Sequence, residues 1–192
     1  DLIIVGSNTP TLLIEGILKA DVIGVFPPLR EASKISKTSS IAILTTELVA
    51  NSKELINYIM RHKFPKRFNF KIINASPLVE LVESGKFIED EKKCKKIIKH
   101  VLVDVLIKNN VDVASLSSTH LPFLLPILRE QFPKMTFVDP ADSVVEKIIK
   151  KMSRKKSKRN TLKVFTSLNP KLFEEYLWRL GIKNKVSFLS LD

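Results

Sequence analysis

The sequence predicts an α/β fold in which mostly parallel sheets are flanked by helices. Short apolar runs typical of buried strands alternate with longer stretches whose apolar residues recur every three or four positions, as on one helix face. Gly, Pro and hydroxyl residues separate these stretches and indicate turns. The expected strands cover residues 1–5, 22–26, 41–44, 70–73, 111–116, 136–138, 162–165 and 186–189, and the expected helices cover residues 10–20, 46–63, 77–84, 91–108, 122–131, 141–151 and 170–180.

The individual elements have recognisable starts and stops. Thr9 is a candidate N-cap for the helix that opens at Pro10, since proline suits the first turn. The helix over 91–108 has the clearest apolar repeat, and Cys94 lies on its stripe. We therefore expect Cys94 to be a small packed side chain rather than a nucleophile. The pair at 27–28 is two prolines, which favour either the start of a short helix or a crossing between domains.

Composition sets the class of protein. A chain of 192 residues with 44% hydrophobic content can bury a core and is not typical of a disordered protein. No apolar run approaches the roughly 18 residues that a membrane span needs. The single cysteine excludes an internal disulfide framework. We expect a cytoplasmic protein that does not contact a membrane.

The net charge of +12 raises the question of a nucleic-acid or other acidic partner. The excess of lysine and arginine gathers in two runs, at residues 92–96 and 150–159. Neither run carries a nucleic-acid module signature or an aromatic stacking platform. We therefore interpret both as solvated basic surface, and a nucleic-acid-binding protein is the less favoured alternative.

Two corners of the chain share one form, in which an apolar strand runs into small polar residues and then a proline. The first corner is Gly6-Ser7-Asn8-Thr9 before Pro10, and the second is Ser117-Ser118-Thr119-His120 before Leu121-Pro122. Each is a strand-to-helix turn at the carboxyl end of a strand. In open α/β sheets that edge is where ligands bind.

These corners resemble the two cysteine motifs of the glutamate racemases, within the aspartate/glutamate racemase family. That family carries Ala-Cys-Asn-Thr after one strand and Gly-Cys-Thr-His-Tyr-Pro after another. The similarity continues in order through four further segments, so it spans nearly the whole chain. These segments are Ile-Ala-Ile-Leu-Thr-Thr at 41–46, Ala-Ser-Pro-Leu-Val-Glu-Leu-Val-Glu-Ser-Gly at 75–85, Val-Asp-Pro-Ala at 138–141 and Val-Phe-Thr-Ser at 164–167.

The resemblance implies two similar α/β lobes that face each other across an active-site cleft. Residues 1–27 together with 141–192 would form one lobe, and residues 28–140 would form the other. The two corners would then meet across the cleft. A homodimer is also what the family suggests.

The resemblance further implies a cofactor-independent racemase that interconverts L- and D-glutamate by two-base proton transfer and serves cell wall biogenesis. No cofactor and no metal is expected, and no His, Cys, Asp or Glu cluster has metal-ligand spacing. The candidate catalytic residues are Ser7, Ser118, His120 and Glu83. The candidate substrate-binding residues are Asn8, Thr9, Thr46, Thr119 and His120.

Both family cysteines are serine in this sequence, at Ser7 and Ser118. A thiol has an ordinary pKa of about 8.5, which a helix N-terminus or a cation lowers, so a thiolate is accessible near neutral pH. A serine hydroxyl is a far weaker acid and needs an adjacent base. His120 can help Ser118, whereas no ionisable residue near Ser7 in sequence can do the same. We therefore expect retained glutamate affinity with weak or absent turnover.

A second departure is that this sequence begins just before the first corner and contains no counterpart of the family's opening segment, which would supply further substrate contacts. Two readings remain open within the fold: a racemase of the glutamate type, or an inactive relative that binds an acidic amino acid.

Overall fold

The computed structural model describes residues 2–152 and 161–190 of the chain. The chain divides into two compact units, Asp1–Met152 and Ser153–Asp192, and each is described by itself. The first residue of the expected strand at 1–5 and most of the basic run at 150–159 lie outside the described residues. Among the helices of the described part, none is long and apolar enough to cross a membrane.

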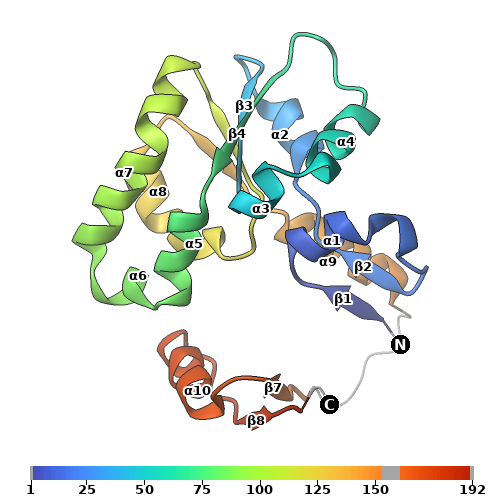
Figure 1. The fold of residues 1–192 in the computed structure, drawn as a ribbon, viewed down its shortest axis with the longest axis vertical. Helices are drawn as coiled ribbons and strands as arrows, with labels where there is room; N and C mark the ends of the chain where they lie inside the picture. The colour runs from blue at the N-terminus through green and yellow to red at the C-terminus, as the bar shows by residue number, and fades with distance from the viewer. Residues whose placement is uncertain (1, 153–160, 191–192) are drawn as a thin grey trace. The chain divides into compact units, whose positions relative to one another are not determined.

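The centre of the first unit is a four-stranded parallel sheet (Figure 1). Its strand order is β4 (Asn69–Asn74), β3 (Ser40–Thr45), β5 (Val113–Leu116) and β6 (Thr136–Val138). Because all three pairings are parallel, the carboxyl ends of the strands lie at one edge. The α/β fold with parallel sheets flanked by helices is thus confirmed.

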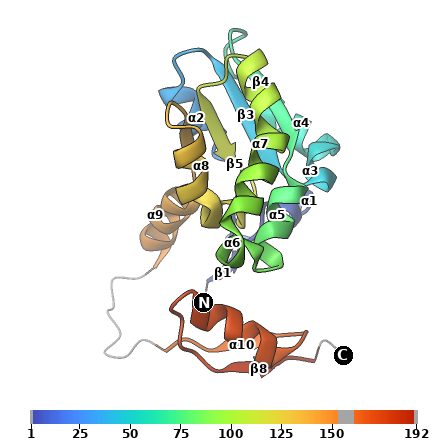
Figure 2. The ribbon, with the colours of Figure 1, turned by 90° about the vertical axis from the view of Figure 1, so that its left-hand side faces the viewer.

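One face of this sheet is covered by α5 (Ser76–Glu83), α7 (Glu91–Lys108) and α8 (Leu125–Gln131) (Figure 1). Ala42, Leu44 and Leu116 point toward these helices and are fully buried. The short α6 (Lys86–Glu89) follows α5 beside α7 (Figure 2), and the 3₁₀-helix η2 (Leu121–Leu124) leads into α8. This face contains the largest apolar cluster of the described residues.

The opposite face is covered by α1 (Asn8–Leu13), α2 (Leu29–Ile35), α3 (Glu47–Ala50) and α4 (Lys53–Arg61). Ile43 of β3 packs here against Leu55 of α4, and both are fully buried. The hydroxyl of Tyr58 donates a hydrogen bond of 2.9 Å to the carbonyl of Pro27, which ties α4 to the start of α2. The alternation along β3 therefore fills two separate cores.

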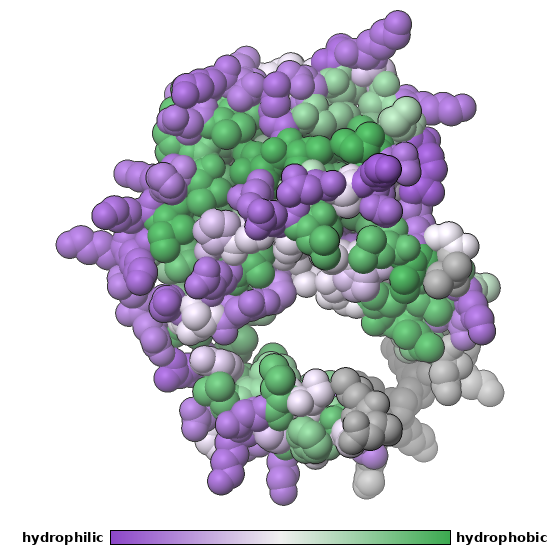
Figure 3. Space-filling model, in the orientation of Figure 1, coloured by the Kyte–Doolittle hydropathy of each residue, from purple (hydrophilic) through white to green (hydrophobic). Residues whose placement is uncertain are grey.

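A second, two-stranded sheet consists of β1 (Ile3–Val5) and β2 (Val22–Gly24), which also pair in parallel. The 3₁₀-helix η1 (Glu15–Ile17) lies between them in sequence, after α1. Ile23 and Val25 pack against Val144 of α9 (Ala141–Lys151) and form a small core of their own. Apolar side chains remain exposed over β1 and α1 (Figure 3), notably those of Ile3 and Leu13.

The second unit is a single strand–helix–strand motif. Its strands β7 (Val164–Thr166) and β8 (Val186–Phe188) are parallel neighbours, joined through α10 (Pro170–Arg179). The side chain of Asn169 caps α10 by accepting from the backbone N–H groups of Lys171 and Leu172. A parallel pair joined through one helix is the arrangement that the sequence predicts for this stretch.

Several expected elements have the predicted nature but different bounds. The helix over 91–108 is confirmed as α7, with Cys94 fully buried on its inner face. Burial is the main reason that the pKa of the Cys94 thiol lies above its ordinary value. The prolines at 27–28 immediately precede α2, which confirms the short helix, while the crossing between domains stays a prediction. The single helix expected over 46–63 is wrong, because the chain breaks at Asn51 and restarts at Ser52, whose hydroxyl caps α4.

The partly buried carboxylate of Asp112 holds the start of β5 in place. Both oxygens of Asp112 accept hydrogen bonds from the segment between α2 and β3. The donors are Ser36 Oγ at 2.7 Å, Lys37 N at 2.6 Å, Thr38 N at 3.2 Å and Thr38 Oγ1 at 2.8 Å. Burial alone would raise the pKa of Asp112, but these hydrogen bonds outweigh it and hold the pKa below its ordinary value of 3.8.

We predict that Asp112→Asn lowers the free energy of unfolding by about 1–3 kcal/mol at neutral pH, since the amide cannot accept all four hydrogen bonds. Because the folded-state pKa of Asp112 is depressed, its contribution is present above the unfolded pKa and is lost as the pH falls from about 4 through the folded value. Urea unfolding at pH 7 and pH 3 measures both effects. The matched control is Asp104→Asn, which removes an exposed ion pair with Lys108 and should change stability by less than about 0.5 kcal/mol. Equal effects of the two substitutions would contradict this account.

Candidate functional site

The two polar corners lie directly after strands of the first unit. Ser7 follows β1 and forms the N-cap position of α1, with extended backbone. The predicted N-cap at Thr9 is therefore wrong, because α1 begins at Asn8 and Thr9 lies inside it. Ser117 and Ser118 follow β5 and precede η2. Both corners are therefore strand-to-helix turns at the carboxyl ends of parallel strands, as the sequence predicts.

The first corner is held by a threonine that the sequence analysis did not single out. The hydroxyl of Thr11, fully buried, donates to the carbonyl of Ser7 at 2.6 Å and accepts from the backbone N–H of Val25 at 3.2 Å. Gly24 lies so close that a Cβ atom there would be 2.3 Å from Thr11 Cγ2. Thr11 and Gly24 thus fix the turn in which Ser7 and Asn8 lie.

Asn8 is the unusual residue of this corner. Its side chain is 2% exposed, and in the part of the chain that the structure describes neither its amide nitrogen nor its amide oxygen has a hydrogen-bond partner. An unpaired buried amide costs free energy, and such groups in native proteins call for an explanation. A donor and an acceptor left unpaired beside a turn are suited to a polar ligand.

The second corner rests on a small network of buried hydroxyls. Thr45 Oγ1 donates to the carbonyl of Ser117 at 3.2 Å, and the hydroxyls of Ser115 and Ser117 lie 2.8 Å apart. The backbone N–H of Ser117 donates to the carbonyl of Leu44 at 2.8 Å. These contacts continue the pairing of β3 with β5 one residue beyond the strands, so the backbone that carries Ser118 is fixed.

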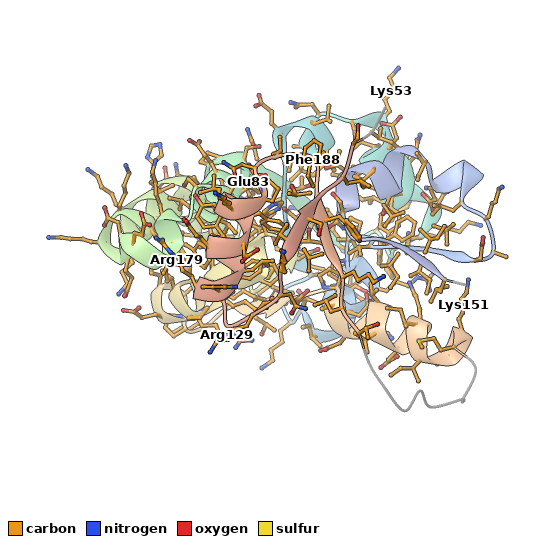
Figure 4. The ribbon with its side chains drawn as sticks, turned by 90° about the horizontal axis from the view of Figure 1, so that it is seen from below. Lys53, Glu83, Arg129, Lys151, Arg179 and Phe188 are labelled. Carbon is orange, nitrogen blue, oxygen red and sulfur yellow. The ribbon has the colours of Figure 1, made fainter. Side chains whose placement is uncertain are left out.

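Three predicted catalytic side chains meet above this network. Ser118 Oγ lies 3.4 Å from His120 Nδ1, and His120 Nε2 lies 3.3 Å from Glu83 Oε1. Glu83 projects from the last turn of α5 (Figure 4). The order is hydroxyl, imidazole, carboxylate, which is the arrangement that orients a histidine beside a serine.

The two corners are joined by side chains. Thr119 Oγ1 donates to the carbonyl of Gly6 at 3.2 Å, and the hydroxyls of Thr9 and Thr46 lie 3.3 Å apart. A surface cavity of about 580 Å³ borders this second contact, with Thr9 on one side and Glu47 on the other. The turns after β1, β3 and β5 are therefore in contact with one another.

The predicted site residues are thus brought together in two groups, Ser118 with His120 and Glu83, and Thr9 with Thr46. Thr119 reaches the backbone of the first corner, next to Ser7. Their roles stay predictions. Thr11, Thr45 and Ser115 were missed. Thr45 is the last residue of β3 and Ser115 the last but one of β5, so position at a strand end was an available signal for these two, whereas Thr11 lies inside α1 and had none. Among the described residues, no group of three or more His, Cys, Asp or Glu side chains is placed to hold a metal ion.

Comparison with known proteins gives a consistent result. No family model matches the sequence. A glutamate racemase from Buchnera aphidicola is 30% identical over 168 residues, covering 84% of this chain and 64% of the relative. A glutamate racemase from Koribacter versatilis is 31% identical over 159 residues, covering 78% of this chain and 52% of the relative. The chain therefore spans less than two thirds of the length of these relatives.

Solved structures show the same fold. The glutamate racemase isoform RacE1 from Bacillus anthracis matches with a TM-score of 0.78 at 22% identity, over 98% of this chain and 73% of that one. The Escherichia coli glutamate racemase in complex with L-glutamate and an activator matches with a TM-score of 0.76 at 18% identity, over 96% and 70%.

The chain has the fold of the solved glutamate racemase structures. Together with the sequence relatives, this shows that the chain is similar to glutamate racemases in both sequence and fold.

The unpaired amide of Asn8 leads to a testable prediction. Asn8→Leu replaces two unsatisfied buried polar atoms with apolar atoms of similar volume, so we expect the free energy of unfolding to rise by about 1 kcal/mol. Asn74→Leu is the matched control, because the exposed Asn74 side chain accepts a hydrogen bond from the backbone N–H of Ser76. That control should lose stability by about 0.5–1 kcal/mol. Urea unfolding measures both, and a loss of stability in Asn8→Leu would show that the amide has a partner.

Proposed function

We propose that this chain binds glutamate at the two corners and is a cofactor-independent racemase of the glutamate type with weak turnover. The contact of Thr119 with Gly6, which joins the two corners, is the observation that carries the proposal, and the contact of Thr9 with Thr46 adds the turn after β3. Two-base racemisation needs one group on each side of the α-carbon, and Ser7 and Ser118 are the hydroxyls that would take these two positions. The family's relatives include an enzyme from Francisella tularensis solved in complex with D-glutamate.

Binding is supported by the polar groups of the corners. The free donor and acceptor of Asn8 can pair with the carboxylate and ammonium groups of an amino acid. The threonines Thr9, Thr46 and Thr119 add hydroxyls beside the same turns. Serine is close in size to cysteine, so the change at Ser7 and Ser118 leaves room for the same ligand.

Turnover is limited by proton chemistry. At the second corner, His120 is within reach of Ser118 and can take its proton. At the first corner, Ser7 is an N-cap whose side chain makes no capping hydrogen bond. Nothing at that corner matches the imidazole beside Ser118, so the two sides are unequal. An inactive relative that binds an acidic amino acid is the alternative within the same family.

The two-lobed organisation is part of this proposal. Residues 1–27 and 141–192 would form one lobe and residues 28–140 the other. The small core shared by Ile23, Val25 and Val144, separate from the clusters on the central sheet, supports this division. We also propose that the protein forms a homodimer and is located in the cytoplasm.

Ion pairs on the surface of α7 make the alternative of a nucleic-acid-binding protein less favoured. Lys95, in the basic run at 92–96, pairs with Glu91 at 2.6 Å and with Glu130 at 2.8 Å. These carboxylates raise the pKa of Lys95 and offset part of the positive charge. Affinity for DNA or RNA that falls steeply with salt would revive this alternative.

Calorimetric titration with L- and D-glutamate tests the binding half of the proposal. We expect both enantiomers to bind, and Asn8→Ala to weaken binding by about tenfold, the equivalent of one or two lost hydrogen bonds. Asn74→Ala, at the exposed end of β4, serves as the control and should leave the affinity unchanged. The absence of heat with either enantiomer would refute the binding half.

Exchange of the α-proton with deuterium tests the turnover half. We expect slow or no exchange in this chain, and a gain of at least about a hundredfold when Ser7→Cys and Ser118→Cys are combined in a chain preceded by the opening segment of a relative. The readout is the NMR signal of the glutamate α-proton. Exchange at an undiminished rate in the serine form would contradict the expectation. If the double variant binds glutamate but does not exchange its α-proton, the alternative of an inactive relative that binds an acidic amino acid would be favoured.

A further inference from the structure

Ser118, His120 and Glu83 form a continuous chain of a hydroxyl, an imidazole and a carboxylate. Each ring nitrogen of His120 faces one partner, Ser118 Oγ at 3.4 Å and Glu83 Oε1 at 3.3 Å. This is the signature of an activated serine nucleophile, in which one group takes the proton and a third group orients the base. Such contacts are often long in ligand-free structures and shorten when a substrate binds.

The serine is presented on a rigid turn. The neighbouring residue Ser117 is held by Thr45 and Leu44, and the backbone N–H of His120 lies 3.5 Å from Ser118 Oγ. A hydrogen bond donated to this oxygen favours its negatively charged form. A serine on a sharp turn between a strand and a helix is also the position that serine hydrolases use for their nucleophile.

The arrangement is confined to one corner. The chain has three histidines. The ring of His62 is stacked on Phe64 and tilted against Tyr58, with Nδ1 at 2.8 Å from the carbonyl of Tyr58, and His100 lies exposed on α7. His120 is thus the histidine that pairs with a serine hydroxyl.

We propose that Ser118 is a nucleophile for acyl transfer from small activated esters. The Oγ atom forms a bond to the acyl carbon while its proton passes to His120 Nδ1. The bond between the acyl carbon and the alkoxy oxygen then breaks, and the leaving alkoxide takes the proton from His120. The products are an O-acyl serine and an alcohol, and water later releases the carboxylic acid by the same route.

The exposed fractions of the three side chains limit the size of the acyl group that can reach Ser118. Ser118 is 5% exposed, whereas the side chains of His120 and Glu83 are 38% and 61% exposed. An electrophile therefore approaches from the side of His120 and has little room beside the serine, which favours an acetyl over a long acyl chain. This activity does not depend on the proposed racemase function, because it needs one corner and no second base.

The test uses 4-nitrophenyl acetate with the full chain. We expect a burst of 4-nitrophenolate equal to one equivalent of protein, and peptide mass mapping should place one acetyl group on Ser118. Ser118→Ala should abolish the burst, and His120→Asn should slow acylation by at least about a hundredfold. His100→Asn and Ser33→Ala are the controls, an exposed histidine on α7 and a serine on α2, and both should react like the parent chain.

Glu83 is a positioning residue in this scheme, and its test separates orientation from mere stability. Glu83→Gln keeps an oxygen that accepts from His120 and should retain most of the rate, whereas Glu83→Ala should lose on the order of tenfold. Glu80→Gln, one turn earlier on α5, should have no effect. Melting curves of all variants control for folding.

Three outcomes would overturn the inference: acetyl groups on lysines or on His120 in place of Ser118, a burst that survives His120→Asn, or a folded chain that is not acylated. Calorimetric binding of glutamate is measured on the same samples, so loss of the acylation activity and loss of the proposed amino-acid site are distinguishable.

Discussion

The structure of the first unit depends on the complete burial of β3. Every residue of this strand is buried, and it pairs in parallel with β4 on one side and β5 on the other. A strand in that position has to be apolar on both faces, which the run Ile41 to Leu44 satisfies. Because the three strands run in the same direction, their polar ends meet at one edge. The chemistry of the site is therefore a consequence of strand direction.

Much of this arrangement could be predicted from the sequence. The apolar repeat of α7 is sustained over its full length, so its bounds and the burial of Cys94 follow directly from periodicity. The two corners were recognisable because each joins an apolar run to small polar residues and a proline. Their resemblance to a known pair of motifs then indicated which distant residues would be neighbours.

The parts that could not be predicted depend on tertiary contacts. The break between α3 and α4 arises because Ser52 caps a new helix, and the apolar side chains of Leu48 and Met60 remain more than 60% exposed. Thr11 and Thr45 look like ordinary residues in sequence. Their hydroxyls matter only because folding brings the carbonyls of Ser7 and Ser117 within reach. The hydrogen bond from Thr45 joins residues 72 positions apart, and a contact between such distant residues leaves no local sequence pattern.

The comparison of the two corners shows how unequal environments can arise from similar sequences. Both place a serine between a strand and a helix, but their neighbours differ. The first corner contains a buried amide that has no hydrogen-bond partner among the described residues, and the second contains an imidazole in contact with a carboxylate. Under the proposed function, the first would mainly hold a polar group and the second would move a proton. A family that normally uses matched thiols on both sides would lose this symmetry when both become hydroxyls.

The burial of the lone thiol on α7 has a practical consequence for chemical labelling. Cys94 is fully enclosed, and its raised pKa keeps it protonated, so alkylating reagents have little access to a thiolate there. The single cysteine of this sequence therefore reacts little with labelling reagents. A single sulfhydryl introduced at either turn would be the selective attachment point for a spin label or fluorophore, and spectroscopy could follow each turn separately.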